Sequence, residues 1–220
     1  MRALVIGSTG GIGAALVTAL TSRGAEVTGL SRRGDGLDIT DASAISRRFA
    51  ALSPGYDLIF TATGALEVNG AAPEKALSAL TPKAMADQFA VNAIGPMMVL
   101  QQAQPLLARD RRAVIATLSA RVGSIGDNRL GGWHSYRMAK AALNQGIRGA
   151  AIELARTHKQ AICVALHPGT VETEFTRKYL GRHPAVPPAE AAENLLRVIA
   201  GLTPGDTGQF YDWAGKRVPW

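Results

Sequence analysis

Short apolar runs alternate along this chain with longer segments whose apolar residues recur at helical spacing. The short runs predict buried strands, which we place at residues 2–6, 26–30, 36–39 (very short), 57–61, 113–118, 161–166 and 209–211. The longer segments predict helices, which we place at residues 11–23, 41–52, 82–108, 135–158 and 189–200.

Strands that alternate with helices predict a parallel sheet covered on both faces, which is a three-layer, doubly wound α/β fold. The length of 220 residues suits one domain with a substantial core, and no repeat or linker divides it. We therefore expect a single domain over residues 1–220 that carries both a cofactor site and a substrate site. Residues 65–80 predict an irregular insertion, and the glycine-rich stretch 119–133 predicts a loop.

The net charge of +7 raises the question of nucleic-acid binding. The basic residues are scattered in pairs with acidic residues between them, which favours solvated surface charge; examples are Arg32–Arg33, Arg47–Arg48 and Arg111–Arg112. The longest mostly apolar stretch, residues 89–100, is too short to cross a bilayer. We expect neither a nucleic-acid partner nor a membrane.

Cys163 is the single cysteine and cannot form an intrachain disulfide. Gly7 ends the first apolar run before a signal peptide could form, so we predict a cytoplasmic protein. No pair of histidines has metal-ligand spacing, and we expect no metal site from them. The histidines are His134, His158, His167 and His183.

A glycine-rich loop separates the first predicted strand from the first predicted helix. A dinucleotide pyrophosphate needs a tight turn, a close backbone approach and free N–H groups at a helix N-terminus. Glycine permits the first two because it lacks a Cβ and tolerates positive φ. The position of this loop therefore indicates a Rossmann-type nucleotide-binding domain. Its predicted contact residues are Gly7, Ser8, Thr9, Gly11, Ile12 and Gly13.

Arg32 and Arg33 follow the second predicted strand. An NAD-preferring site usually carries an acidic side chain there to bind the ribose hydroxyls. A carboxylate would repel a 2′-phosphate, whereas a guanidinium can bind it with two hydrogen bonds. The sequence therefore predicts NADP(H) in preference to NAD(H), and the alternative is that both arginines are only surface charge.

Tyr136 and Lys140 stand at positions i and i+4, on one face of a predicted helix. A free tyrosine has a pKa of about 10. An ammonium about 4 Å from the phenolate, at an effective dielectric constant of about 20, stabilises it by roughly 4 kcal/mol. This corresponds to about three pKa units. That interaction would bring the phenol into the working range of a general acid or base. Alone, a tyrosine four residues before a lysine is weak evidence for a catalytic pair. A glycine loop earlier in the same α/β chain makes that evidence stronger.

Together with residues 91–96 and 168–173, these motifs resemble the short-chain dehydrogenase/reductase family over essentially the whole chain. Within that family the chain is most similar to C-factor-like and sniffer-like carbonyl reductases. The shared features are residues 123–128, the Gly-Trp before Tyr136 and the closing Pro219-Trp220.

The resemblance implies that Tyr136 protonates a carbonyl oxygen as hydride arrives. It also implies that Lys140 lowers the tyrosine pKa and holds the nicotinamide ribose, and that Asn92 anchors a water linking the lysine to solvent. Asp38 and Ile39 match the segment that cradles adenine. Further cofactor contacts are expected from Tyr136 itself and from Thr63, Gly64, Pro168, Gly169, Val171 and Thr173.

The chain departs from the family pattern at two places near the expected site. Residues 61–64 read Thr-Ala-Thr-Gly where the family usually has Asn-Asn-Ala-Gly. The family pattern Ser-x-x-Gly, counted back from Gly123, reaches Ala120, and Ser119 lies one position earlier. We predict Ser119 as the residue that hydrogen-bonds the substrate, with Ser124 or no serine as the alternatives.

These features predict an NADP-dependent oxidoreductase that acts on a carbonyl or alcohol substrate. An NADP-binding regulator with little turnover is the alternative, motivated by the offset serine. The chain between the second strand and Asp38 is too short for the usual helix, and little chain follows Thr173 to cover a substrate. We therefore expect an open site for a small carbonyl compound. The resemblance further implies a homodimer or homotetramer formed through residues 83–108 and 135–158.

Overall fold

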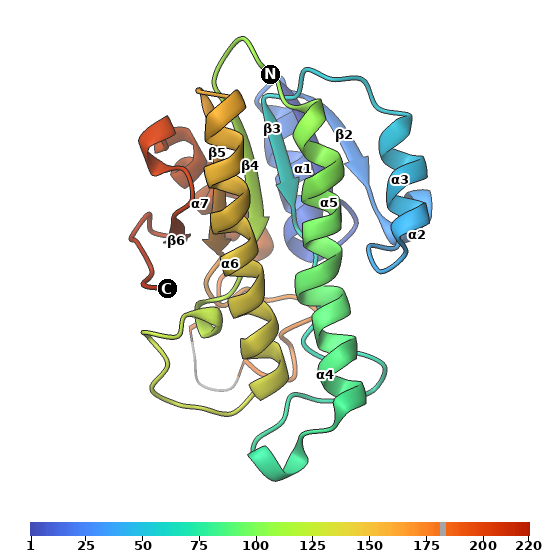
Figure 1. The fold of residues 1–220 in the computed structure, drawn as a ribbon, viewed down its shortest axis with the longest axis vertical. Helices are drawn as coiled ribbons and strands as arrows, with labels where there is room; N and C mark the ends of the chain where they lie inside the picture. The colour runs from blue at the N-terminus through green and yellow to red at the C-terminus, as the bar shows by residue number, and fades with distance from the viewer. Residues whose placement is uncertain (181–183) are drawn as a thin grey trace.

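Six of the predicted apolar runs form a parallel sheet whose strand order is β2-β1-β3-β4-β5-β6 (Figure 1). The computed structural model describes residues 1–180 and 184–220. The strands are β1 (Arg2–Ile6), β2 (Glu26–Leu30), β3 (Leu58–Thr61), β4 (Ala113–Leu118), β5 (Ala161–His167) and β6 (Phe210–Asp212). Because β1, β3, β4 and β5 are buried almost throughout, their near-continuous apolar sequences are those of a sheet covered on both faces.

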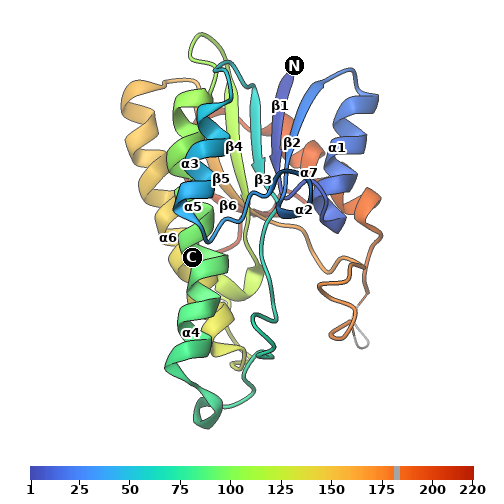
Figure 2. The same cartoon turned by 90° about the vertical axis from the view of Figure 1, so that its right-hand side faces the viewer.

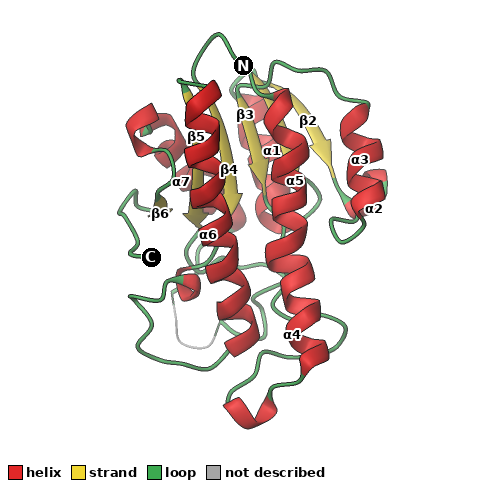
Figure 3. Cartoon of the chain, in the orientation of Figure 1, coloured by secondary structure: helices red, strands yellow, loops and turns green. Residues whose placement is uncertain are grey.

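Helices cover both faces of this sheet, as Figures 2 and 3 show. They are α1 (Gly11–Ser22), α2 (Arg32–Asp35), α3 (Ala42–Ala50), α4 (Pro82–Phe89), α5 (Gly95–Ala103), α6 (His134–Thr157) and α7 (Pro188–Gly201). Helices α1 and α7 bury their apolar residues against one face, and α3, α5 and α6 bury theirs against the other. The predicted three-layer, Rossmann-type fold is confirmed.

The predicted short strand at residues 36–39 is wrong. Ser31 instead caps the one-turn helix α2 by accepting a hydrogen bond from the N–H of Gly34, so the chain between β2 and Asp38 does contain a helix. Gly36 ends that turn with a left-handed φ of 68°. The Asp38 carboxylate then accepts the Thr40 N–H, which turns the backbone away from the sheet edge.

The insertion at residues 65–80 is irregular, as predicted, apart from one 3₁₀ turn at Leu77–Ala79. The predicted helix after Thr81 is present, but its hydrogen-bonding pattern changes along its length. Helix α4 continues through a π-helical turn, Ala90–Ile94, into α5, and a 3₁₀ turn, Gln104–Leu106, ends it. π-helical turns occur often at functional sites, and this one carries Asn92.

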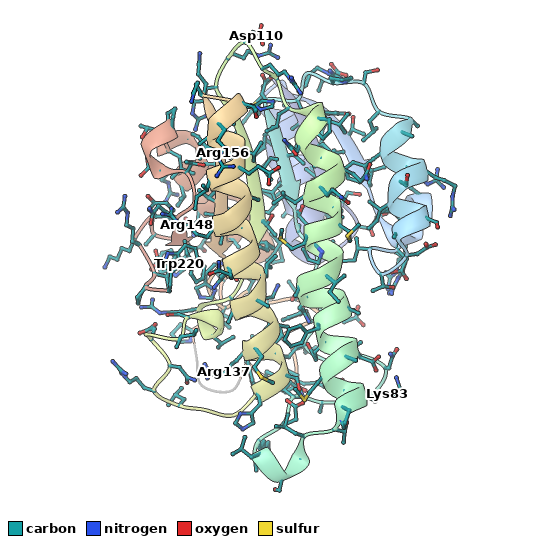
Figure 4. All side chains as sticks on the ribbon, in the orientation of Figure 1. Lys83, Asp110, Arg137, Arg148, Arg156 and Trp220 are labelled. Atoms are coloured by element: carbon teal, nitrogen blue, oxygen red, sulfur yellow. The ribbon has the colours of Figure 1, made fainter. Side chains whose placement is uncertain are left out.

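Basic side chains are spread over the surface. Among those labelled in Figure 4, Lys83 lies on α4, whereas Arg137, Arg148 and Arg156 are distributed along α6. The labelled basic residues lie on two different helices, and Lys83 forms an ion pair with Asp87 of its own helix. No helix within the described residues is long and apolar enough to span a bilayer.

Candidate active site

A cleft of about 830 Å³ opens at the carboxyl ends of the strands. All neighbouring strands are parallel, and the arrows of β2, β3, β4 and β5 in Figure 1 point toward this end of the sheet. In open parallel α/β sheets, ligands bind outside the carboxyl ends of the strands. The cleft brings together residues that lie far apart in the sequence, from Gly7 through Tyr136 to Thr176.

The glycine loop forms the floor of the cleft between β1 and α1. Gly7 has a φ of +85°, and its N–H donates to the carbonyl oxygen of Leu30 at 2.7 Å. Helix α1 begins at Gly11 with Gly10 before it, and no side chain of the described residues accepts a hydrogen bond from the N–H groups of its first turn. A Cβ added at Gly13 would lie 2.1 Å from the Gly7 oxygen. The loop thus has the shape and the donors that a pyrophosphate requires.

We expect Gly13→Ala to destabilise the protein by about 1–3 kcal/mol, because the backbone must shift to admit the new methyl group. Thermal unfolding and an NADPH titration measure the effect, and both the melting temperature and the affinity should fall. Gly149→Ala in α6 is the matched control, since no atom lies within 4 Å of its added Cβ. Unchanged melting and binding in Gly13→Ala would contradict this account of the loop.

Two buried polar atoms in the cleft lack a hydrogen-bond partner among the described residues. They are Thr63 Oγ1 and His167 Nδ1. Burial, with a smaller contribution from Arg121, lowers the pKa of His167 to about 4, so its imidazole is neutral at neutral pH. Buried polar atoms are usually hydrogen-bonded, so two unpartnered atoms in the cleft are an exception of the kind found at sites that hold water or a ligand. His167 was not among the predicted site residues, and its position at the end of β5, directly before Pro168, is the sequence signal that marks it.

The two predicted phosphate-binding arginines begin α2, directly after β2, and both are exposed at the cleft. Asp38 and Ile39 line the same end of the cleft. Hydrogen bonds from Thr40 are the main cause of the lowered pKa of Asp38, and Arg32 makes a smaller contribution. This part of the cleft therefore carries one carboxylate that is already hydrogen-bonded, beside two guanidinium groups that form no hydrogen bond or ion pair with any other described residue.

Tyr136 and Lys140 lie together in the cleft, one helical turn apart on α6. Lys140 is 2% exposed, its Nζ donates to the Leu118 oxygen at 3.1 Å, and it lies 5.9 Å from the centre of the Tyr136 ring. Burial raises the pKa of Tyr136 and lowers the pKa of Lys140 to about 7.

The predicted lowering of the Tyr136 pKa by Lys140 is therefore not found in this structure. The physical reason is desolvation, which penalises the phenolate and the ammonium alike, so the lysine loses much of the charge that was to stabilise the phenolate. A protonated Tyr136 is nevertheless the form that can donate a proton.

Asn92 and Gly64 lie next to Lys140. A Cβ built on Gly64 would lie 3.1 Å from Asn92 Oδ1 and 3.5 Å from Lys140 Nζ, so only glycine leaves this space free. The buried Asn92 amide accepts the N–H of Ala65 and donates to the oxygens of Ala65 and Gln88. Asn92 thus fixes the start of the insertion beside the lysine, and its role in holding a water stays a prediction.

The serine region shows where each candidate hydroxyl points. Ser119 lines the cleft, but its hydroxyl donates to Asn144 Oδ1 at 2.6 Å, which counts against its predicted role. Ser124 donates to the Pro219 oxygen and accepts the Asp127 N–H, so it holds the loop to the C-terminal segment. Ala120 lines the cleft at the position where the family pattern has serine.

The opposite wall of the cleft comes from the segment after β5. It includes the predicted residues Pro168, Gly169, Val171 and Thr173, together with Phe175. Thr173 contacts the glycine loop, because a Cβ on Gly11 would lie 2.6 Å from its Cγ2. Residues 181–183, which belong to the stretch that we expected to leave the site open, lie outside the described residues, as does the predicted non-ligand His183. In the described part of the chain no group of three or more metal-binding side chains comes together.

Comparisons with known proteins agree with this geometry. The family profile described as "Enoyl-(Acyl carrier protein) reductase" matches residues 6–210. The chain is 37% identical to the C-signal protein of Myxococcus xanthus over 62% of this chain and 78% of that protein. It is 29% identical to 1-hydroxy-2-glutathionyl-2-methyl-3-butene dehydrogenase of Rhodococcus sp. (strain AD45), over 99% of this chain and 98% of that one.

Among solved structures, an NADPH-bound carbonyl reductase from chicken fatty liver aligns with a TM-score of 0.84 and 25% identity, over 100% of this chain and 98% of that chain. The profile match covers nearly the whole chain and includes the glycine loop, Tyr136 and Lys140. The protein therefore belongs to the short-chain dehydrogenase/reductase family and is an oxidoreductase of that family, with relatives in the branch predicted from its motifs.

Proposed function

We propose that this protein is an NADPH-dependent reductase of a small carbonyl compound. The observation that carries the proposal is the pair Tyr136 and Lys140, buried together in a cleft that also contains the glycine loop. NADPH would be held by the glycine loop, the arginines of α2, Lys140 and the 168–173 segment, and when bound it supplies the hydride. Tyr136 donates its phenolic proton to the carbonyl oxygen, and Lys140 holds a partial positive charge beside that phenol.

Loss of NADPH absorbance against a panel of aldehydes and ketones tests this function. We expect turnover of at least one small carbonyl compound together with saturable NADPH binding. Turnover that requires no Tyr136 hydroxyl, or a failure to bind NADPH, would contradict the proposal. The same assay run with an alcohol and NADP⁺ measures the reverse reaction.

The preference for NADP(H) over NAD(H) is part of the proposal. It is supported by the position of Arg32 and Arg33 at the cleft and by the NADPH bound to the carbonyl reductase of similar structure. We expect the double variant Arg32→Ala/Arg33→Ala to weaken NADPH binding by about 10- to 100-fold, because charge-assisted hydrogen bonds to a phosphate are worth about 1.5–3 kcal/mol. NADH binding should change little, because NADH lacks the 2′-phosphate.

Fluorescence titration with each nucleotide measures the two affinities. Arg156→Ala, on α6 in Figure 4, is the control for removal of a surface charge outside the cleft-lining residues. An equal loss of NADPH and NADH affinity in the double variant would show that the arginines do not distinguish the nucleotides.

A regulator with little turnover is the second candidate. It is favoured by Ala120 at the family's serine position and by the hydrogen bond that occupies the Ser119 hydroxyl. The relative named C-signal also fits such a role. Tight NADPH binding without turnover across the carbonyl panel would support this candidate over the reductase.

Assembly and location stay predictions within this proposal. We expect a homodimer or homotetramer, and the long helices carry exposed apolar side chains at Ile94, Met138 and Ile152 that such an interface would cover. Light scattering measures the assembly. A cytoplasmic location follows only from the sequence argument.

A further inference from the structure

The chain enters helix α6 through an unusual backbone path. Gly131, Gly132 and Trp133 are all left-handed, with φ values of 62°, 64° and 50°. Left-handed conformations cost little for glycine but are unfavourable for a tryptophan. Tyr136 follows three residues later, and the Trp133 ring packs edge-on against it with centroids 6.4 Å apart. The strained turn therefore lies directly before the proposed proton donor, where the surrounding structure must hold it in place.

Glu74 of the insertion supplies that support from a distant part of the sequence. Its main-chain oxygen accepts the Trp133 N–H at 2.5 Å. Its carboxylate accepts both the N–H of Ser135, at 3.1 Å, and the Ser135 hydroxyl. Glu74 is 7% exposed and Ser135 is 0% exposed, so water does not replace these bonds readily. No side chain of the residue before α6 caps the helix, and Glu74 fills this role from another segment.

The charge of Glu74 suits this position. The N-terminus of a long helix carries partial positive charge that stabilises a nearby carboxylate. Burial tends to raise the pKa of Glu74, but hydrogen bonds, first of all from the Ser135 hydroxyl, outweigh it, and the pKa is lowered overall. The carboxylate is therefore ionised at neutral pH. No ion pair with Glu74 occurs among the described residues, and its charge is stabilised by hydrogen bonds from Ser135 and from its own backbone N–H, with a smaller contribution from the nearby His134.

We propose that Glu74 is a positioning residue for the proposed reaction, which holds the first turn of α6, and with it Tyr136, in the orientation needed for proton transfer. This inference rests on the proposed function. It follows from three hydrogen bonds that join one residue of the insertion to Trp133 and Ser135, on the two sides of the helix start. Glu74 acts through this turn and does not itself line the cleft.

The same insertion forms part of the cleft wall. Asn92 holds its first residue, Ala65, and Glu67 lines the cleft while accepting hydrogen bonds from Lys178 and Tyr179. The insertion is thereby fixed to Asn92, to the catalytic helix and to the segment after β5. Glu74 connects the wall that faces substrate to the helix that carries Tyr136.

Three variants test the role of Glu74. Glu74→Ala removes the carboxylate that accepts from Ser135 and keeps the main-chain oxygen that accepts from Trp133. Glu74→Gln keeps one side-chain oxygen acceptor without the charge, and Glu153→Ala removes an exposed carboxylate elsewhere on α6 as the control. We expect Glu74→Ala to lower kcat at least 10-fold, with the NADPH dissociation constant changed less than 2-fold. Glu74→Gln should recover part of the lost kcat, and Glu153→Ala should match the wild type.

Amide hydrogen exchange gives a readout that does not need turnover. In Glu74→Ala, exchange should become faster in residues 134–140 and stay unchanged in residues 143–154. Unchanged kcat and exchange, or a parallel loss of NADPH affinity and of protection throughout the protein, would overturn the inference. If the wild type reduces no carbonyl compound, the proposed function fails, and the exchange result still decides whether Glu74 holds the helix start.

Discussion

Replacing Tyr136 with phenylalanine is expected to lower carbonyl reduction by about 10²- to 10⁴-fold, the range typical for loss of a general acid. Phenylalanine retains the ring that packs beside Trp133 and Phe175. Burial keeps the phenol protonated at neutral pH, so the wild-type side chain always has a proton to donate. The variant loses that proton and little else. Steady-state turnover with NADPH and the best substrate of the panel measures the effect.

NADPH affinity is the control for Tyr136→Phe. We expect it to change by a small factor only, because the glycine loop and the arginines are untouched and lie outside α6. Melting temperature should also remain close to that of the wild type. Turnover at the wild-type rate would show that the reaction draws its proton from another group, and the proposed chemistry would then be wrong.

Introducing a serine at Ala120 is expected to increase turnover, by about 10-fold. Removal of one hydrogen-bond donor to a developing oxyanion costs about 10²–10³-fold in enzymes that have one, so a donor added without prior optimisation should recover part of that range. Ala120 lines the cleft together with Tyr136, whereas the Ser119 hydroxyl is donated to Asn144. The expected gain is therefore one hydrogen bond to the carbonyl oxygen that the wild-type protein lacks.

Ser119→Ala is the partner variant for this experiment. If Ser119 only holds Asn144, its loss should reduce stability and change kcat much less than the gain from Ala120→Ser. The opposite result, a large fall in kcat for Ser119→Ala with no gain for Ala120→Ser, would show that Ser119 turns toward substrate as the sequence first suggested. Both variants are assayed with the same carbonyl compound at saturating NADPH.

Local sequence patterns determined most of the fold. The strands β1 and β4 begin and end where their apolar runs do, because burial on both faces of a parallel sheet demands continuous apolar residues. The capping residues Asp41 and Thr81 also mark their helices, since each side chain accepts a backbone N–H of the first turn. The run at residues 36–39 failed as a strand because Gly36 and Asp38 form turns that override its apolar pattern.

The sequence by itself also placed the glycine loop and the Tyr136–Lys140 pair in one cleft. Glycines after the first strand and a tyrosine four residues before a lysine are local features, and a doubly wound sheet brings the carboxyl ends of its strands to one edge. These two facts place the glycine loop beside Tyr136 and Lys140 without further information.

Only the tertiary structure decided the direction of individual side chains and the charges they carry. The Ser119 hydroxyl turns to Asn144, and Glu74 reaches Ser135 across 61 positions of sequence. Burial, which is a property of the whole fold, reversed the pKa shift expected for Tyr136. Helical spacing predicts the neighbours of each residue along α6. Contacts between distant segments and the desolvation of buried side chains depend on tertiary packing, which no local pattern encodes.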